Sequence, residues 1–326
     1  MTRANSLRLR FAAMEPRDFR MPAADGTAIF VRSFLPEKAP RAIVQIAHGM
    51  AEHGGRYARL AEALCAHGYG AYASDHRGHG QTARGREELG HFADEDGWNK
   101  VVSDQVALLA ELASRHPGVP AFLLGHSMGS YVARSTALRV GDQLAGLILS
   151  ATSHDRPIVV QAARLLAAAE RARLGKRGKS KLLRKLTFEA FNKRIDDPRT
   201  TCDWLSRDPF EVDKYLADPL CGFDCSAQLY WDMFGGMAEI FSPAQLKKLP
   251  QRLPVYVLAG EKDALNNDLA GIKKLHAALE LAGLEQVTVR IYPGARHELL
   301  NETNRDEVTR ELIAWLDERM LLQGRA

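Results

Sequence analysis

The ten residues from Ala121 to Ser130, Ala-Phe-Leu-Leu-Gly-His-Ser-Met-Gly-Ser, constrain the fold of this chain more than any other stretch. They join a short apolar run to a Gly-x-Ser-x-Gly pentapeptide, and a helical pattern follows. A buried strand that turns abruptly into a helix forces Ser127 at the tip into a cramped backbone conformation, and the flanking glycines remove Cβ atoms that would clash there. The stretch therefore predicts a nucleophile elbow with Ser127 as the nucleophile. The alternative is a glycine-rich turn with an incidental serine.

Strand and helix patterns alternate on both sides of this stretch. Apolar strands are predicted at 42–47, 69–73, 121–124 and 144–150 with helices between them, and a β-hairpin is predicted over 17–37. This alternation predicts an α/β fold, built on a mostly parallel, doubly wound sheet with helices on both faces.

The alternation breaks after Ser150. From 151 to 249 the patterns are helical and no strand is evident. The elements predicted here and beyond are helices at 159–173, 179–192, 271–281 and 306–322 and strands at 254–259 and 287–292. We therefore expect residues 1–150 and 250–326 to form one core, interrupted by a helical cap over 151–249.

Two late loops can supply the groups that activate Ser127. His297 and Asp263 each follow the carboxyl end of a predicted strand, where open α/β sheets place their functional groups. A serine hydroxyl is a weak nucleophile near neutral pH, so it needs a general base. We predict His297 as this base and Asp263 as the carboxylate that holds its tautomer and stabilises the imidazolium. Glu261 and Asp268 share the loop of Asp263 and remain alternatives for the acid.

Acyl transfer also needs hydrogen-bond donors for the negative oxygen of the tetrahedral intermediate. We predict the backbone N–H of Met128, directly after the nucleophile, and that of Met50, in the loop after the strand at 42–47. For that loop, a plain strand-ending turn is the alternative. This chemistry requires neither a cofactor nor a metal, and we expect none.

Composition is typical of a globular protein and does little to define a partner. Hydrophobic residues make up 46% and charged residues 26%, which is ordinary for a soluble domain, and the formal net charge is +4. Four cysteines are too few for a disulfide framework, so we expect a reducing, cytoplasmic location. Cys221 and Cys225 have no second cysteine pair and no nearby histidine, which favours free thiols over a zinc site. We expect no signal peptide and no membrane-spanning segment.

A cluster of basic residues interleaved with leucines and phenylalanines lies in the predicted cap. Such a basic amphipathic helix can contact an anionic membrane surface transiently or attract a phosphate-bearing substrate. An ordinary solvated surface is the alternative. No recognised nucleic-acid-binding module accompanies the charges, so we expect no nucleic-acid partner. The basic residues are Arg171, Arg173, Lys176, Arg177, Lys179, Lys181, Arg184 and Lys185.

Five motifs follow one another along the chain. They are His48-Gly49-Met50-Ala51-Glu52-His53, Asp75-His76-Arg77-Gly78-His79-Gly80, Gly125-His126-Ser127-Met128-Gly129, Gly260-x-x-Asp263 and His297-Glu298. In this order they resemble the monoacylglycerol lipase and lysophospholipase group of the α/β-hydrolases, which overlaps with the serine aminopeptidase-like hydrolases. The resemblance covers about residues 27–316, although the cap matches only in position and helical character. It implies an α/β-hydrolase fold, a triad of Ser127, Asp263 and His297, and oxyanion amides at Met50 and Met128.

The predicted activity is hydrolysis of a lipid-like monoacyl ester, a monoacylglycerol or a lysophospholipid, through an acyl-Ser127 intermediate. A serine aminopeptidase or amide hydrolase of the same fold is the alternative. That reaction needs an anionic partner for a free α-amino group, and Glu239 or Asp232 in the cap could serve. A catalytically silent binding scaffold is a third reading, but such proteins usually lack a triad member and this chain lacks none. No oligomeric state is predicted.

Overall fold

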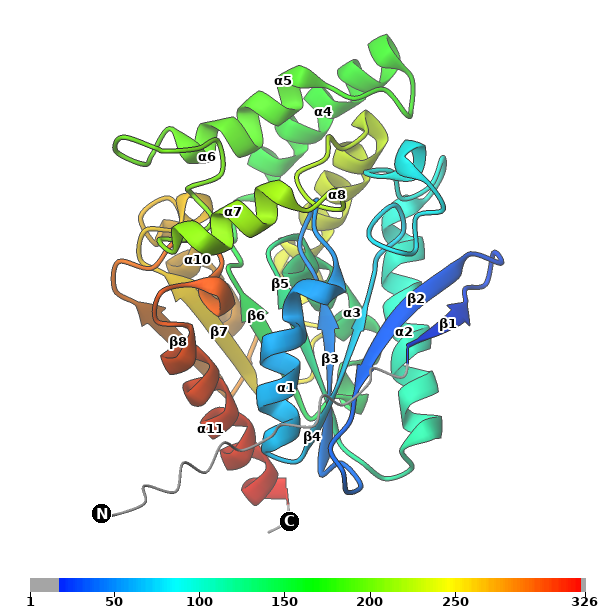
Figure 1. Cartoon of the computed structure of the whole chain (residues 1–326), viewed down its shortest axis with the longest axis vertical. Coiled ribbons are helices and arrows are strands. Elements are labelled where there is room, and N and C mark those ends of the chain that lie inside the picture. Colours follow the sequence, from blue (N-terminus) through cyan, green and yellow to red (C-terminus); the bar gives the residue numbers. More distant parts are fainter. Residues whose placement is uncertain (1–17, 324–326) are drawn as a thin grey trace, which may run out of the picture.

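The computed structural model describes residues 18–323 of the chain. An eight-stranded sheet forms its centre, in the order β1-β2-β4-β3-β5-β6-β7-β8 (Figure 1). β1 pairs antiparallel with β2, and β2 with β4, whereas all the other pairs are parallel. The predicted α/β fold class with a mostly parallel sheet is therefore confirmed. The strands are β1 Phe19–Pro22, β2 Ala28–Phe34, β3 Ala42–Ala47, β4 Tyr69–Ser74, β5 Ala121–His126, β6 Gly146–Ser150, β7 Val255–Gly260 and β8 Val287–Tyr292.

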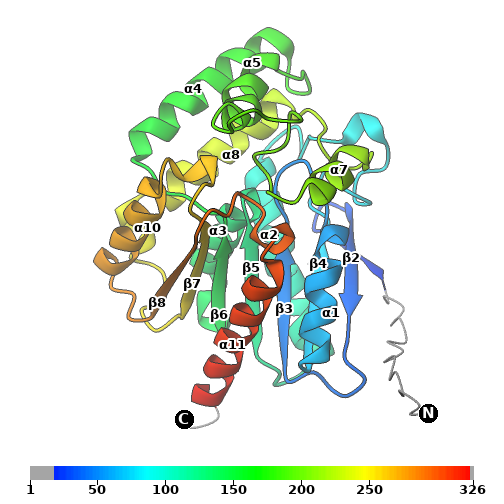
Figure 2. The same ribbon diagram turned by 60° about the vertical axis from the view of Figure 1, so that its left-hand side comes forward.

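Helices cover both faces of the sheet (Figure 2). These are α1 Ala58–Ala66, α2 Gly97–Arg115, α3 Met128–Val140, α10 Ala270–Leu281 and α11 Arg305–Gln323. On one face Leu64 of α1 and Leu312 of α11 belong to the same apolar cluster as Phe122. On the other, α2, α3 and α10 share a cluster with Leu123. Neighbouring residues of a strand point to opposite faces, so β5 contributes side chains to both clusters.

Between β6 and β7 the described residues form helices and no strand. All of them but the last, α9, lie beyond the carboxyl ends of the central strands (Figure 1), and α4 packs along α8. The predicted helix over 179–192 is present as two short helices joined by a π-helical turn. The position and helical character agree with the predicted cap, while its treatment as a separate unit stays a prediction. The elements are α4 Pro157–Leu174, α5 Lys181–Arg184, the π-helical turn Lys185–Glu189, α6 Ala190–Asn192, α7 Pro209–Ala217, α8 Ala227–Ile240 and α9 Pro243–Leu246.

Some predicted boundaries differ from those observed. β6 begins at Gly146, two residues late, because the N–H of Leu144 donates to the carbonyl of Gly141 and closes a 3-10 turn there. The predicted hairpin is present as β1 and β2. Its first residue, Arg17, and the N-terminal residues considered for a signal peptide lie outside the described residues. The 3-10 helices are η1 Gly54–Tyr57, η2 Arg86–Glu88, η3 Gly141–Gln143, η5 Ala264–Asn266 and η6 Leu299–Asn301.

The four cysteines are free thiols, as predicted. Within residues 18–323, none of the helices combines the length and the apolar character needed to cross a bilayer.

Candidate active site

Ser127 lies at a tight turn between β5 and α3. Its backbone angles are φ 52 and ψ −121, a strained conformation for a residue with a side chain. The glycines of the motif make the turn sterically feasible: a Cβ on Gly125 would overlap the carbonyl oxygen of Gly129, and a Cβ on Gly129 would overlap that of Ala47. The N–H of Ser127 donates to the carbonyl of Ser150 at 2.9 Å, which ties the turn to β6. The strand, turn and helix follow in the order that the sequence pattern predicts.

The backbone strain at Ser127 can be measured from the free energies of unfolding of two variants. Ser127→Gly removes the Cβ that penalises φ 52. We therefore expect it to be more stable than Ser127→Ala by about 1 kcal/mol, even after the entropy cost of a glycine. Urea denaturation of the two variants measures the difference. A Ser127→Ala variant of equal or greater stability would show that the elbow stores no such strain.

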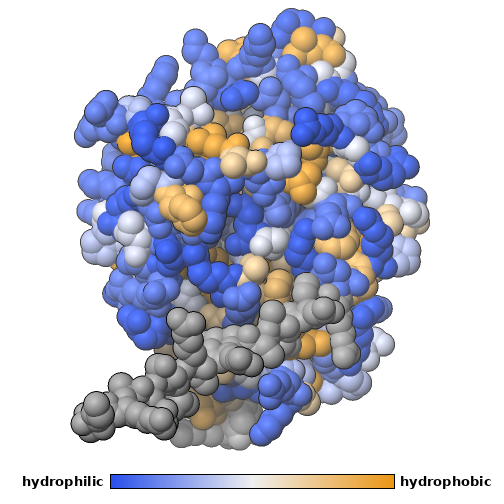
Figure 3. Space-filling model, viewed as in Figure 1, coloured by the Kyte–Doolittle hydropathy of each residue, from blue (hydrophilic) through white to orange (hydrophobic). Residues whose placement is uncertain are grey.

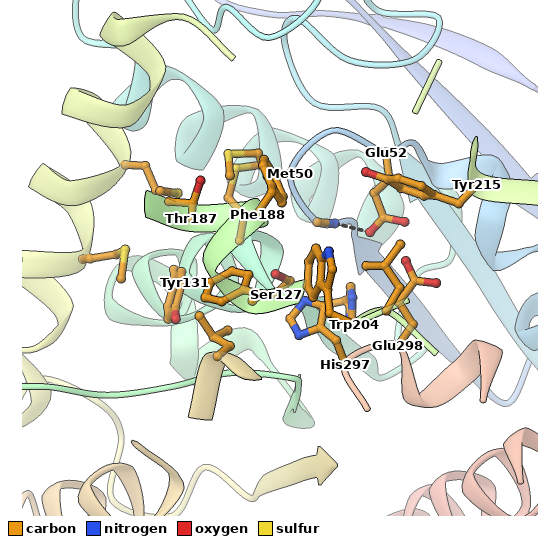
Figure 4. Close-up of a pocket in the computed structure, with 18 of the residues that line it drawn as sticks. Met50, Glu52, Ser127, Tyr131, Thr187, Phe188, Trp204, Tyr215, His297 and Glu298 are labelled. Carbon is orange, nitrogen blue, oxygen red and sulfur yellow. Dashed lines mark hydrogen bonds between the residues drawn. The ribbon is translucent and has the colours of Figure 1, made fainter. Parts of the chain in front are cut away.

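Asp263 and His297 meet beyond the carboxyl ends of β7 and β8. Nδ1 of His297 lies 3.0 Å from Oδ1 of Asp263, and both side chains are buried. Asp263 also accepts hydrogen bonds from Leu265 N at 3.0 Å and Asn266 Nδ2 at 3.2 Å, which hold its carboxylate in place. His297 and Ser127 line the same cavity, and Figure 4 shows them together near its centre. Such an arrangement can move a proton from a serine hydroxyl to an imidazole that a carboxylate orients.

The two alternative acids make other contacts. Glu261 accepts a hydrogen bond from the N–H of Gly294 at 2.8 Å. Asp268 pairs with Arg194 at 2.9 Å, and its side chain is 85% exposed. Of the three carboxylates in this described loop, Asp263 is therefore the one that contacts His297.

Opposing effects set the protonation of His297. Burial alone lowers the pKa of the imidazole, but the facing Asp263 carboxylate raises it, and Glu298 and Glu52 add to the increase. The net pKa lies above the ordinary value of 6.5.

The loop after β3 brings Met50 close to Ser127, and both residues line the cavity. A Cβ built on Gly49 would lie only 3.3 Å from the Cβ of Ser127, so the glycine allows this close approach. The ring of His48 holds the loop, because Nδ1–H donates to the carbonyl of Gly49 at 2.7 Å and Nε2 accepts the N–H of His76 at 2.9 Å. Burial lowers the pKa of His48 well below 6.5, which keeps the ring neutral and able to accept.

Met128 is the first residue of α3. Its N–H therefore belongs to the amides at a helix N-terminus that have no acceptor within the helix. With the N–H of Met50, this gives two candidate donors near Ser127, and their role in catalysis stays a prediction.

A buried ion-pair network borders the cavity, and sequence analysis assigned no role to it. Nη1 of Arg56 lies 2.8 Å from Glu52, and Nη1 and Nη2 lie 2.5 and 2.7 Å from the two oxygens of Glu298. Glu52 also accepts the N–H of Gly49 at 2.5 Å. Because Glu298 directly follows His297, the network connects the loop of the predicted base to the loop of Met50. The two glutamates were visible in the sequence motifs, but their shared partner was not.

The cavity has a volume of about 160 Å³, and the cap supplies a largely apolar and aromatic wall. The ring of Trp204 lies 4.9 Å from that of His297, measured between ring centres. The sequence does not single out this wall, because its residues come from three separate segments of the cap that only the tertiary structure brings together. The apolar lining from the cap consists of Phe188, Phe191, Trp204, Leu205, Met233, Phe234 and Met237.

The acidic residues considered as partners for an α-amino group are not among the residues that line this cavity. Asp232 is buried, accepts a hydrogen bond from Gln228 at 3.0 Å, and has its pKa raised to about 6 by burial. Glu239 is exposed. The carboxylates that do line the cavity are Glu52 and Glu298, which Arg56 neutralises.

One group of metal-ligating side chains comes together among residues 18–323: donor atoms of His53, Asp218 and Cys221 lie within 4.8 Å of one another. The expectation that Cys221 has no nearby histidine is therefore wrong, because the loop after β3 meets the segment after α7. Nδ1 of His53 accepts the N–H of Gly55 at 3.1 Å, so the ring proton is on Nε2 and is donated to Asp218 at 2.9 Å. A protonated Nε2 is not free to bind a metal, and the group fits a hydrogen-bonded pair beside a thiol better than a preformed metal site.

Comparisons with known proteins identify the family and several relatives of this chain. The family described as serine aminopeptidase, S33, matches residues 38–304. The monoglyceride lipase of Homo sapiens is 31% identical over 93% of this chain and 91% of that protein. The monoacylglycerol lipase of Mycolicibacterium smegmatis is 29% identical over 89% of this chain and 93% of that protein. A solved thermostable carboxyl esterase from Bacillus coagulans, in complex with glycerol, has a TM-score of 0.86 at 28% identity and covers 94% of this chain and 99% of its own.

Proposed function

This chain belongs to the serine aminopeptidase S33 family of α/β-hydrolases, and on that premise we propose that it hydrolyses a lipid-like monoacyl ester, with Ser127, His297 and Asp263 as its catalytic triad. A monoacylglycerol or a lysophospholipid is the proposed substrate class. One observation carries the proposal: an apolar, aromatic-walled cavity is lined by both a serine on a strained elbow and a histidine in a buried pair with an aspartate. The names of the similar lipases and esterase support the same class of reaction.

In the proposed mechanism Oγ of Ser127 attacks the ester carbonyl carbon while Nε2 of His297 takes the hydroxyl proton. Asp263 accepts the Nδ1–H of His297 and stabilises the imidazolium. The N–H groups of Met50 and Met128 stabilise the negative oxygen of the tetrahedral intermediate. His297 then gives its proton to the departing alcohol, which leaves the acyl group on Ser127. A water molecule activated by the same imidazole attacks this acyl-enzyme and releases the fatty acid.

Amide or aminopeptidase activity is the second candidate, and the family description is the observation that favours it. A free α-amino group needs an uncompensated carboxylate in the cavity. Glu52 and Glu298 line the cavity but form ion pairs with Arg56. We therefore rank the ester substrate above the amide.

Hydrolysis of a small substrate panel tests the proposal. The panel holds p-nitrophenyl esters of short and long chains, a monoacylglycerol, a lysophospholipid and an aminoacyl anilide. We expect ester turnover that falls in Ser127→Ala by a factor on the order of 10⁴–10⁶. Turnover of the anilide alone would overturn the substrate class, and ester turnover that persists in Ser127→Ala would overturn the nucleophile. A wild type that neither turns over nor reacts with a fluorophosphonate would point to a silent scaffold.

The pH dependence of the reaction reports on His297. The imidazole must be neutral to accept the serine proton, so activity is present above its pKa and lost as the pH falls through it. Since that pKa is raised, we expect the acid limb of kcat/KM to have its midpoint above pH 6.5. A short-chain ester without ionisable groups gives the profile. A midpoint well below this value would contradict the assigned base.

Transient contact of the cap with an anionic membrane surface is a further part of the proposal. Ile158 and Leu165 on α4 are 68% and 73% exposed, and Figure 3 shows a hydrophobic patch at the cap end of a mostly hydrophilic face. Part of the basic charge is already paired within the protein, for example Arg177 with Asp94. The exposed apolar side chains therefore matter as much as the charge. Co-sedimentation with phosphatidylglycerol vesicles should weaken in Ile158→Ser with Leu165→Ser, and equal loss in Leu281→Ser, outside the cap, would contradict the contact.

A further inference from the structure

A buried arginine without an acidic partner joins the elbow helix to the cap. Arg134 lies on α3 and is 2% exposed. None of the ion pairs described within residues 18–323 includes it, and its Nε has no hydrogen-bond partner there. A guanidinium buried without a carboxylate is costly, so its hydrogen bonds must account for its position.

Those hydrogen bonds reach the segment that leads into α4 and the last residue of α8. Nη1 of Arg134 donates to the carbonyl of Ser153 at 3.1 Å, and Nη2 donates to Nδ1 of His154 and to the carbonyl of Ile240, each at 3.1 Å. Ser153 and His154 lead from β6 into α4, whereas Ile240 ends α8. The carbonyl end of a helix favours a positive charge. One guanidinium therefore holds the start of α4 and the end of α8 on the elbow helix.

Aromatic contacts extend this connection to the wall of the cavity. The guanidinium of Arg134 lies 5.2 Å from the ring centre of Phe241, the residue after α8. The rings of His154 and Tyr131 lie 4.5 and 5.9 Å from that of Phe241. Tyr131 is one turn before Arg134 on α3, and it lines the cavity.

The same pair of helices supplies part of the apolar wall. α4 and α8 pack along each other, and Met233, Phe234 and Met237 of α8 line the cavity. We propose that Arg134 is a positioning residue, which fixes the α4–α8 pair over the cavity and so determines how well long acyl chains are held near Ser127. The effect on ester hydrolysis rests on the proposed function, whereas the effect on the stability of α4 and α8, measured by hydrogen exchange, does not.

Three variants distinguish this positioning role from a general contribution of Arg134 to the stability of the fold. Arg134→Met removes the charge and all three hydrogen bonds at similar length, and Arg134→Lys keeps the charge but has a single nitrogen that cannot span the three acceptors. Arg139→Met is the matched control, because Arg139 is on the same helix and forms exposed hydrogen bonds with Ser103 and Asn99.

We expect the ratio of kcat/KM for long-chain over short-chain esters to fall about ten-fold in Arg134→Met, which is only part of what the loss of its three hydrogen bonds costs in total. The fall should be smaller in Arg134→Lys and absent in Arg139→Met, while kcat for the short ester is retained. Hydrogen exchange should become faster in α4 and α8 and remain unchanged in the central strands.

An unchanged chain-length ratio together with unchanged exchange in α4 and α8 would overturn the inference. Equal losses on all esters with faster exchange throughout the sheet would also overturn it, because they indicate a general loss of stability. If Arg134→Met does not fold, the chain-length ratio and the hydrogen exchange of Arg134→Lys are compared with those of wild type and Arg139→Met instead. A wild type that hydrolyses no ester would refute the proposed function, while the exchange measurement would still decide the role of Arg134.

Discussion

Asp263→Asn is expected to lower kcat for ester hydrolysis by about four orders of magnitude. Oδ1 of Asp263 faces Nδ1 of His297 at 3.0 Å. An amide NH₂ at that position favours the imidazole tautomer with its proton on Nε2, and this nitrogen then cannot take the proton of Ser127. Asparagine has the same shape as aspartate, and its carbonyl oxygen at the Oδ2 position can still accept the Nδ2–H of Asn266. The N–H of Leu265 loses its acceptor, so we expect the fold to be retained with a modest loss of stability. Steady-state kinetics with a short-chain ester, and a urea denaturation curve, measure both effects.

Asp268→Asn is the control for this experiment. Asp268 shares the loop but is 85% exposed and pairs with Arg194, so we expect wild-type activity. A mild loss in Asp263→Asn, or a comparable loss in Asp268→Asn, would move the acid to another carboxylate.

Arg56→Met should destabilise the fold by about 3–5 kcal/mol, the cost of leaving buried charges without their partner. The variant removes the guanidinium from between Glu52 and Glu298, which are 3% and 5% exposed. Methionine fills a similar volume, so the loss reflects charge more than packing. Arg115→Met is the matched control, because Arg115 pairs with Glu111 at the surface and its loss should cost under about 1 kcal/mol.

The destabilisation in Arg56→Met should depend on pH. In the wild type, burial alone would raise the pKa of Glu298, but Arg56 more than offsets burial and lowers that pKa to about 2. A lowered pKa in the folded state adds stability above the unfolded value, and this stability is lost as the pH falls toward 2. Without Arg56, burial dominates and raises the pKa, so the same carboxyl stabilises the fold at low pH and loses that contribution as the pH rises. Urea denaturation should therefore show a smaller gap between variant and wild type at acidic pH than at alkaline pH. A gap that does not change with pH would argue against the buried pair.

Much of the fold was predictable because its causes are local. The apolar runs of β3, β5 and β7 are short and bounded by turn residues, so each reads as a buried strand without knowledge of its neighbours. The elbow was predictable for the same reason, since the steric demands on Gly125 and Gly129 come from a turn only a few residues long. Parallel strands end at one edge of a sheet, and this rule brought His297 and Asp263 to the side of Ser127 as candidates.

By itself, the sequence therefore determined the sheet, the elbow and the candidate loops, whose geometry depends on neighbouring residues and on a general rule of chain topology. Only the tertiary structure decided which carboxylate of the loop contacts His297. It also decided that Arg56 joins Glu52 and Glu298, which lie near opposite ends of the chain. It also decided that Trp204 faces the cavity and that Arg134 reaches both ends of the α4–α8 pair. These contacts depend on how separate elements pack. A side chain's partner across such an interface leaves no periodic signal in the sequence, because its position is set by the rotation and distance of two elements and not by its own neighbours.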